Sequence, residues 1–281
     1  MLSEYEILES KIKEHGTLFK NREVFTTSYL PEIYNFRNNQ LKAMAVYYDG
    51  VEEGIVPQHM LLYGSFATGK TSTTQTFFKS AEKRYDNLIC IHVNCRFNTA
   101  EYDVLSAIYK SLFKGAKIEV KLSSILLFEK IVDYIIKNDK ILVVALDDYI
   151  YIKKNIELNN LLFKLLRANE VYPDAKISII AITNYEGKMD LEQRVATVFR
   201  PVEINFPKYS YNEMYSILKQ RCQLGLIEGV LSREVLELIT NNTYDIGDLR
   251  NGISLLNQGA KNAELYGRVF ITPECIFRIL E

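Results

Sequence analysis

The segment Gly64-Ser65-Phe66-Ala67-Thr68-Gly69-Lys70-Thr71 has the spacing of a phosphate-binding loop, and it constrains the fold more than any other part of the chain. The apolar run Met60–Tyr63 before it is typical of a short buried strand, and the residues from Ser72 onward are typical of a helix. Strand, glycine-rich loop and helix in this order aim backbone N–H groups and a helix dipole at one point, which suits phosphate. Lys70 would reach the β- and γ-phosphates of a nucleotide, and the Thr71 hydroxyl would bind Mg²⁺. We therefore predict that residues 64–72 bind a nucleoside triphosphate; a chance match in a turn is the alternative.

Predicted strands and helices alternate through most of the chain. Nearly continuous apolar runs predict five strands, at Met60–Tyr63, Leu88–Asn94, Ile141–Leu146, Ile177–Ile182 and Val202–Phe206. Helical stretches lie between them, at Glu101–Phe113, Leu122–Lys137 and Asn155–Asn169. Such alternation after a phosphate loop predicts an α/β domain of the P-loop NTPase class, with three layers and a parallel five-stranded sheet, over residues 1–207.

From about residue 208 the pattern contains helices only. A capping box at Ser210-Tyr211-Asn212-Glu213 should start a helix that runs to about Gln223. Three more helices are predicted. One begins after Ser232 and ends near Asn241, one runs from about Asp248 to Leu265, and the last starts at Thr272-Pro273. Residues 208–281 are therefore predicted to form a small all-helical domain.

Charge and composition narrow the function classes only slightly. The chain has 281 residues with 34 basic and 35 acidic side chains, a formal net charge of −1, so nucleic-acid binding would need a local basic patch. No apolar stretch reaches membrane-spanning length and the amino terminus is not signal-like, so we expect a cytoplasmic protein with no membrane partner. The scattered cysteines are interpreted as buried thiols.

Two aspartates, Asp147 and Asp148, follow the third predicted strand. In a nucleotide-binding α/β domain, an acidic residue at this strand end faces the phosphate loop, so Thr71 and Asp147 are the predicted Mg²⁺-binding residues. Asp148 would orient or deprotonate the attacking water. Two adjacent aspartates at a strand end could also be simple turn formers.

Two further polar residues are candidates for contact with the triphosphate. Asn184 closes the fourth predicted strand, where its amide would lie beside the γ-phosphate; an ordinary turn residue is the alternative. Arg250 lies near the start of a helix in the all-helical part, where it would make closure of a lid depend on nucleotide. A solvated arginine side chain is the alternative for Arg250.

These elements together resemble an AAA+ ATPase, and finer detail resembles the archaeal replication initiators, relatives of the eukaryotic origin recognition complex and its cell-division-control loader. The similar segments are Asn21-Arg22-Glu23-Val24-Phe25, Tyr29-Leu30-Pro31, Arg37-Asn38-Asn39-Gln40-Leu41, His92-Val93-Asn94-Cys95-Arg96, Tyr102-Asp103-Val104-Leu105, Leu165-Leu166-Arg167, Pro207 and Gly247-Asp248-Leu249-Arg250. The resemblance implies a nucleoid-associated ATPase that initiates DNA replication and uses ATP, ADP and Mg²⁺ as a conformational switch. It also implies that Asn184 is sensor 1 and Arg250 is sensor 2.

The same resemblance implies partners. It predicts other AAA+ subunits or a replicative helicase, and an arginine donated to a neighbour's ATP. Arg194 fits the family's Arg-Val pair and is the candidate, with Arg200 as the alternative. Adenine should lie between the amino-terminal segment and the lid, with core packing as the alternative role for its four apolar candidates, Phe25, Tyr29, Leu30 and Pro31.

Duplex origin DNA is the remaining expected partner. The family binds it through a helical insertion after the second strand, which here carries Lys110, Lys114, Lys117 and Lys121. A solvated helix face is the alternative for these lysines. Lys153 and Lys154 form a weaker candidate patch.

The chain departs from the family pattern in two places. The usual acidic pair is Asp-Glu, whereas the second residue here is Asp148, so ATP could bind well and be hydrolysed slowly. The family also carries a winged-helix domain after the lid, and we expect none within these 281 residues. That departure keeps a second function open: an AAA+-like regulatory module, of a helicase-loader or transposition type, that binds ATP and recognises protein rather than DNA.

Overall fold

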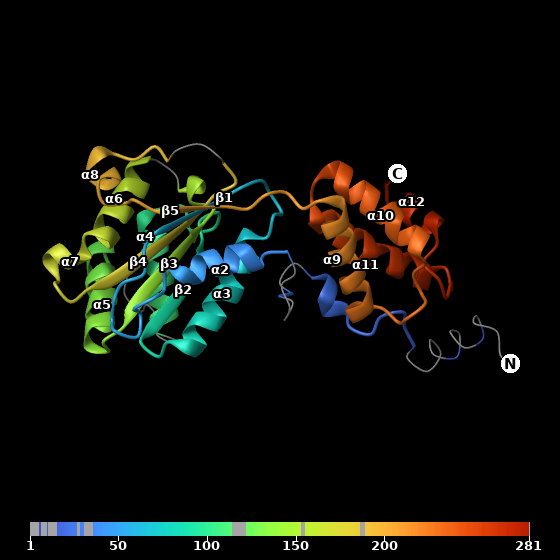
Figure 1. Ribbon diagram of the computed structural model, residues 1–281, viewed down its shortest axis with the longest axis horizontal. Helices are drawn as coiled ribbons and strands as arrows, with labels where there is room; N and C mark the ends of the chain where they lie inside the picture. The colour runs from blue at the N-terminus through green and yellow to red at the C-terminus, as the bar shows by residue number, and fades with distance from the viewer. Residues whose placement is uncertain are drawn as a thin grey trace. The chain divides into compact units, whose positions relative to one another are not determined.

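A computed structural model describes residues 6, 10, 16–26, 29–30, 36–113, 122–152, 155–185 and 189–280 (Figure 1). By its internal contacts the chain divides into two units. The sheet unit comprises Arg37–Ser65 and Gly69–Phe206. The helical unit comprises Met1–Phe36, Phe66–Thr68 and Pro207–Glu281.

The sheet unit is built on five parallel strands. They are β1 (Met60–Tyr63), β2 (Leu88–Asn94), β3 (Ile141–Asp147), β4 (Lys176–Ile182) and β5 (Val202–Asn205), in the spatial order β2-β3-β4-β1-β5. In this register Asp147 lies opposite both Asn94 and Ile182, so the carboxyl ends of β2, β3 and β4 meet at one edge. The predicted α/β class and parallel five-stranded sheet are confirmed.

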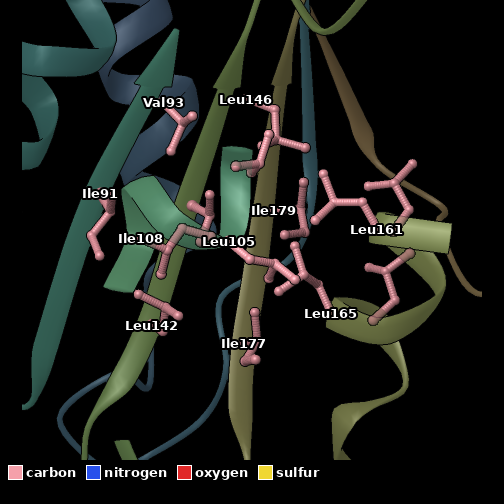
Figure 2. Close-up of a cluster of buried hydrophobic side chains, with 14 of the residues drawn as sticks. Ile91, Val93, Leu105, Ile108, Leu142, Leu146, Leu161, Leu165, Ile177 and Ile179 are labelled. Atoms are coloured by element: carbon pink, nitrogen blue, oxygen red, sulfur yellow. The ribbon is translucent and has the colours of Figure 1, made fainter. Parts of the chain in front are cut away.

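Alternation along the strands sends side chains to two helical layers. Leu142, Val144 and Leu146 of β3 pack in one cluster with the helices α4 (Glu101–Leu112), α5 (Ser124–Lys137) and α6 (Asn155–Leu166). Ile141, Val143 and Ala145 pack in a second cluster with α2 (Asn38–Val46) and α3 (Lys70–Arg84). Figure 2 shows part of the first cluster, where Ile91, Leu142 and Ile179 of three strands lie on the face of the sheet that Leu105 of α4 and Leu165 of α6 cover. Both faces of the sheet are therefore covered, as the nearly continuous apolar runs predict.

Some short elements differ from the predicted ones. The predicted helix Asn155–Asn169 is two helices, α6 and α7 (Ala168–Val171), because the backbone of Arg167 leaves helical geometry, with φ −109° and ψ 17°. The helix α2 was not predicted from the sequence. Met44 is its one buried residue, so it lacks the apolar stripe that signals a helix. The short helices η2 (Tyr149–Tyr151) and α8 (Gln193–Ala196) also went unpredicted.

The carboxy-terminal part of the helical unit contains α9 (Tyr211–Gly225), α10 (Arg233–Ile246), α11 (Leu249–Leu265) and α12 (Pro273–Leu280). The capping box at Ser210 and Glu213 is present, and Ser232 and Asp248 cap the next two helices. The predicted end near Asn241 is wrong, because α10 continues to Ile246. Polar residues there suggest a stop, yet the buried Thr240 and Thr243 hydroxyls donate to helix carbonyls one turn back, at 2.7 Å each.

An amino-terminal segment packs within the same unit. Leu18, Phe19 and Phe25 are buried in one cluster with residues of α9, α10, α11 and α12. The Lys20 N–H donates to the Gly225 carbonyl at 2.9 Å, and η1 (Arg22–Phe25) follows. No helix within the described ranges is long and apolar enough to cross a membrane.

Candidate nucleotide site

The predicted phosphate loop joins β1 to α3 at the carboxyl edge of the sheet. Gly64 has a φ of 139°, and a Cβ at this position would lie 2.3 Å from the Phe206 carbonyl oxygen. Ala67 and Gly69 also have positive φ, 55° and 87°, and Gly69 is the residue before the first turn of α3. The loop thus needs left-handed backbone at its turns, which glycine supplies at two of the three positions.

The Lys70 side chain lies along its own loop. Its Nζ donates to the carbonyl oxygens of Gly64 and Ser65, at 2.7 Å each. The ammonium group is therefore held at the mouth of the loop, where a phosphate could replace the carbonyl partners.

Thr71, in the first turn of α3, contacts the end of β3. Its Oγ1 donates to Asp147 Oδ2 at 2.7 Å. The sequence predicts this pair as metal-binding residues, and the structure brings the two oxygens together. Such a pair fits Mg²⁺, which takes one or two protein oxygens and fills its remaining positions with water and phosphate. Within the described ranges, no group of three or more His, Cys, Asp or Glu side chains could form a larger metal cage.

His92 is a third member of this group that the sequence prediction missed. Its Nε2 lies 2.9 Å from the same Asp147 Oδ2. The missed signal was strand order: once β2 is placed beside β3, residues near the end of β2 must lie close to Asp147.

Asp148 lies directly after β3 and is held by two side chains. Arg96 Nε donates to Asp148 Oδ2 at 2.6 Å, and Asn184 Nδ2 donates to Asp148 Oδ1 at 2.7 Å. Asp148 has left-handed backbone, with φ 56° and ψ 45°, a conformation that aspartate tolerates better than most residues. The structure therefore joins the predicted water-orienting residue to the predicted sensor Asn184, and adds Arg96, whose guanidinium also lies 4.3 Å from the Tyr151 ring centroid.

Cys95 follows β2 and is buried near Asp147 and Asp148. Burial, with Asp147 and Asp148 nearby, raises the pKa of its thiol to about 12. The thiol therefore stays protonated at neutral pH and is a poor nucleophile, as expected for a structural cysteine.

Several residues predicted to contact the nucleotide belong to the helical unit. Arg250 is exposed at the start of α11, and its backbone N–H donates to the capping Asp248 Oδ1 at 2.8 Å. Tyr29 packs against an arginine of the same unit, since the Arg221 guanidinium lies 4.6 Å from its ring centroid. Leu30 is the next residue in the chain. Phe25, an adenine candidate, is buried in the core of this unit. Pro31 lies outside the described residues, and the roles of Arg250, Tyr29 and Leu30 stay predictions.

Arg194 is held by its own unit. Its Nε donates to Glu192 Oε2 at 2.6 Å, its Nη2 donates to Asn160 Oδ1 at 3.0 Å, and its guanidinium lies 5.0 Å from the Phe163 ring centroid. Arg200, the alternative, is exposed. The predicted role in trans stays a prediction for both.

Lys110 is the predicted DNA-binding lysine that the structure describes. Lys110 is exposed in the last turn of α4. Lys114, Lys117, Lys121, Lys153 and Lys154 lie outside the described residues.

Known proteins resemble this chain in sequence along most of its length. The family model of the Cdc6 AAA+ ATPase-type lid domain matches residues 215–278. The chain is 37% identical to the ORC1-type DNA replication protein 2 of Methanosarcina mazei, over 94% of this chain and 71% of that protein. It is 33% identical to the ORC1-type DNA replication protein 2 of Methanothermobacter thermautotrophicus, over 94% of this chain and 70% of that protein. The chain belongs to the ORC1-type DNA replication protein family.

Solved structures agree with this family membership. The Aeropyrum pernix ORC1 protein in complex with DNA is 26% identical, with a TM-score of 0.81 over 92% of this chain and 68% of that one. The resemblance to archaeal replication initiators, and the AAA+ fold with a helical lid that it implies, are therefore confirmed. Within an ORC1-type protein, the cluster of Lys70, Thr71, Asp147, Asp148 and Asn184 is the candidate nucleotide site.

Proposed function

We propose that this ORC1-type protein binds and hydrolyses ATP with Mg²⁺ and acts as a DNA replication initiator. The hydrogen bond between Thr71 Oγ1 and Asp147 Oδ2 carries the proposal, because it places a loop hydroxyl and a strand-end carboxylate together beside the phosphate loop. Nucleotide state would set the angle between the α/β domain and the lid, as in hinge closure around a ligand. Arg250 would contact the triphosphate and thereby make closure of the lid depend on the bound nucleotide.

The residues of the sheet unit suggest how hydrolysis would proceed. Lys70 would leave the Gly64 and Ser65 carbonyls and bind the β- and γ-phosphates, where its charge stabilises the transition state. Thr71 and Asp147 would hold Mg²⁺, which when bound neutralises charge on the phosphates. Asp148 would orient the attacking water, with its carboxylate kept in place by Arg96 and Asn184.

Asp148→Glu is expected to raise the single-turnover rate of ATP hydrolysis, by on the order of tenfold. The longer side chain would bring its carboxylate about one methylene closer to the water. Left-handed backbone suits glutamate less well than aspartate, so the variant should also be slightly less stable. Rapid mixing of enzyme in excess over ATP, followed by quantification of ADP, measures the rate; an unchanged rate would contradict a reach-limited Asp148.

We propose duplex DNA as one partner and other AAA+ subunits or a replicative helicase as others. The DNA proposal is supported by family membership and by the DNA complex of the A. pernix relative. The contact would be made by the lysines that follow the second strand, Lys110, Lys114, Lys117 and Lys121. A neighbouring subunit would receive Arg194 or Arg200 at its ATP; Arg194 would first have to leave Glu192, whereas Arg200 is already exposed.

The near-neutral net charge favours a second candidate, a regulatory module that binds ATP and recognises protein. Fluorescence anisotropy with a labelled duplex, at increasing salt and with ATP present, separates the two. An initiator should lose affinity steeply with salt, since each phosphate contact contributes a slope of about −0.9 in a log–log plot. Absence of binding at low salt, with ATP binding intact, would favour the regulatory module.

A further inference from the structure

His92 makes a contact with the candidate metal carboxylate that the function proposed above leaves without a role. Its Nε2 lies 2.9 Å from Asp147 Oδ2. A carboxylate oxygen accepts hydrogen bonds, so this pair forms with the His92 tautomer that carries a proton on Nε2, which is then the donor.

Asp147 Oδ2 therefore accepts from two elements at once. Thr71 Oγ1 approaches from α3 at 2.7 Å, and His92 Nε2 approaches from β2. Among the described residues, no side-chain hydrogen bond to Asp147 Oδ1 is present. Two donors on one oxygen fix the rotation of the carboxylate and leave the other oxygen for a further ligand.

The two donors differ in what else they must do. Under the proposed function, the Thr71 oxygen is itself a metal ligand at the end of a loop that has to accommodate phosphate. His92 stands on β2, and β2 and β3 are paired along their full length from Leu88 opposite Ile141 to Asn94 opposite Asp147. The Cys95 N–H extends that ladder by donating to the Asp147 carbonyl at 2.8 Å. The position of His92 relative to Asp147 is thus set by the sheet and not by the loop.

The contact is also sheltered from water. The side chains of His92 and Asp147 are 18% and 7% exposed. A hydrogen bond between such groups meets little competition from solvent, so it can hold a side chain in one rotamer.

We infer that His92 is a positioning residue that holds Asp147 in the orientation in which it receives Mg²⁺. The inference rests on the proposed nucleotide function. Hydrogen bonds to the ligands of a metal typically account for about 10–100-fold in metal affinity. Loss of the His92 donor should therefore raise the Mg²⁺ requirement of nucleotide binding and leave Mg²⁺-free binding unchanged.

The test compares His92→Leu with His92→Gln in the full chain. Leucine removes the donor, whereas the glutamine amide restores an N–H at a similar reach. Cys90→Ala is the matched control, because Cys90 lies two residues earlier on the same strand and packs toward the same helical layer as Ala145. Binding of a fluorescent ATP analogue is titrated in EDTA and at increasing MgCl₂, and the melting temperature of each variant is recorded.

We expect His92→Leu to need about 10–100-fold more Mg²⁺ for half-maximal enhancement of analogue binding. His92→Gln and Cys90→Ala should stay close to wild type, and all four proteins should bind equally in EDTA. An unshifted Mg²⁺ midpoint in His92→Leu would overturn the inference, and so would equal losses in the leucine and glutamine variants or a loss confined to melting temperature. Absence of analogue binding by wild type at every Mg²⁺ concentration would instead overturn the proposed function, and the inference with it.

Discussion

Lys70→Ala is expected to lower single-turnover ATP hydrolysis by about 10³-fold or more and to weaken ATP binding strongly. The Lys70 ammonium lies at the mouth of the loop, 2.7 Å from the carbonyl oxygens of Gly64 and Ser65. Charge-assisted bonds to phosphate are stronger than these bonds to neutral carbonyls, so a bound triphosphate should draw the side chain away from the loop. Alanine removes that interaction in both the ground state and the transition state.

Lys79→Ala is the matched control for this experiment. Lys79 lies on the same helix as Lys70 but is exposed. Isothermal titration with ATP gives the affinity, and rapid quench gives the rate, for both variants and for wild type. Equal hydrolysis by the Lys70 and Lys79 variants would show that the loop is not the catalytic phosphate site.

Features whose sequence signal is local could be predicted. The loop glycines, the apolar strands and the capping box at Ser210 each report on a few consecutive residues, and each is found as predicted. The Thr71–Asp147 pairing could be predicted because both residues sit at ends of elements that a phosphate loop is known to bring together.

Contacts that depend on strand order or on tertiary packing could not be predicted. The hydrogen bonds from His92 to Asp147 and from Arg96 to Asp148 exist because β2 lies beside β3. That strand order is not visible in any local stretch of the sequence. Leu18 and Phe19 pack against helices some two hundred residues later, and nothing in their local pattern indicates which helices those are. The buried Thr240 and Thr243 hydroxyls similarly find acceptors within α10, so the helix continues past the polar residues that suggest its end.

Backbone strain was the other feature that could not be foreseen. Ala67 has a φ of 55° within the loop, where a glycine would be expected from the conformation alone. An alanine in this region costs roughly 1–2 kcal/mol relative to right-handed backbone. The rest of the loop must therefore hold it there, which makes the glycines on either side less tolerant of change.

Gly64→Ala should be the most damaging single-methyl change in the loop. The new Cβ would lie 2.3 Å from the Phe206 carbonyl oxygen, and φ at this position is 139°. Since neither the Phe206 carbonyl nor the strand that precedes Gly64 can move freely, we expect a loss of more than about 3 kcal/mol in the free energy of unfolding. The start of the loop should also be displaced, and a displacement of about 1 Å can cost roughly 10²-fold in function, so ATP binding should fall with stability.

Gly54→Ala separates the steric clash from the backbone effect. Gly54 belongs to the same unit and has a φ of 82°, but the nearest atom to its new Cβ is Lys176 Nζ at 3.0 Å, the end of a flexible side chain. This control should cost only about 1–2 kcal/mol, from left-handed backbone alone. Urea unfolding and ATP titration of both variants measure the difference. If the two variants lost the same stability, Phe206 would have moved aside; if Gly64→Ala kept wild-type ATP affinity, the turn at Gly64 would not set the position of the loop.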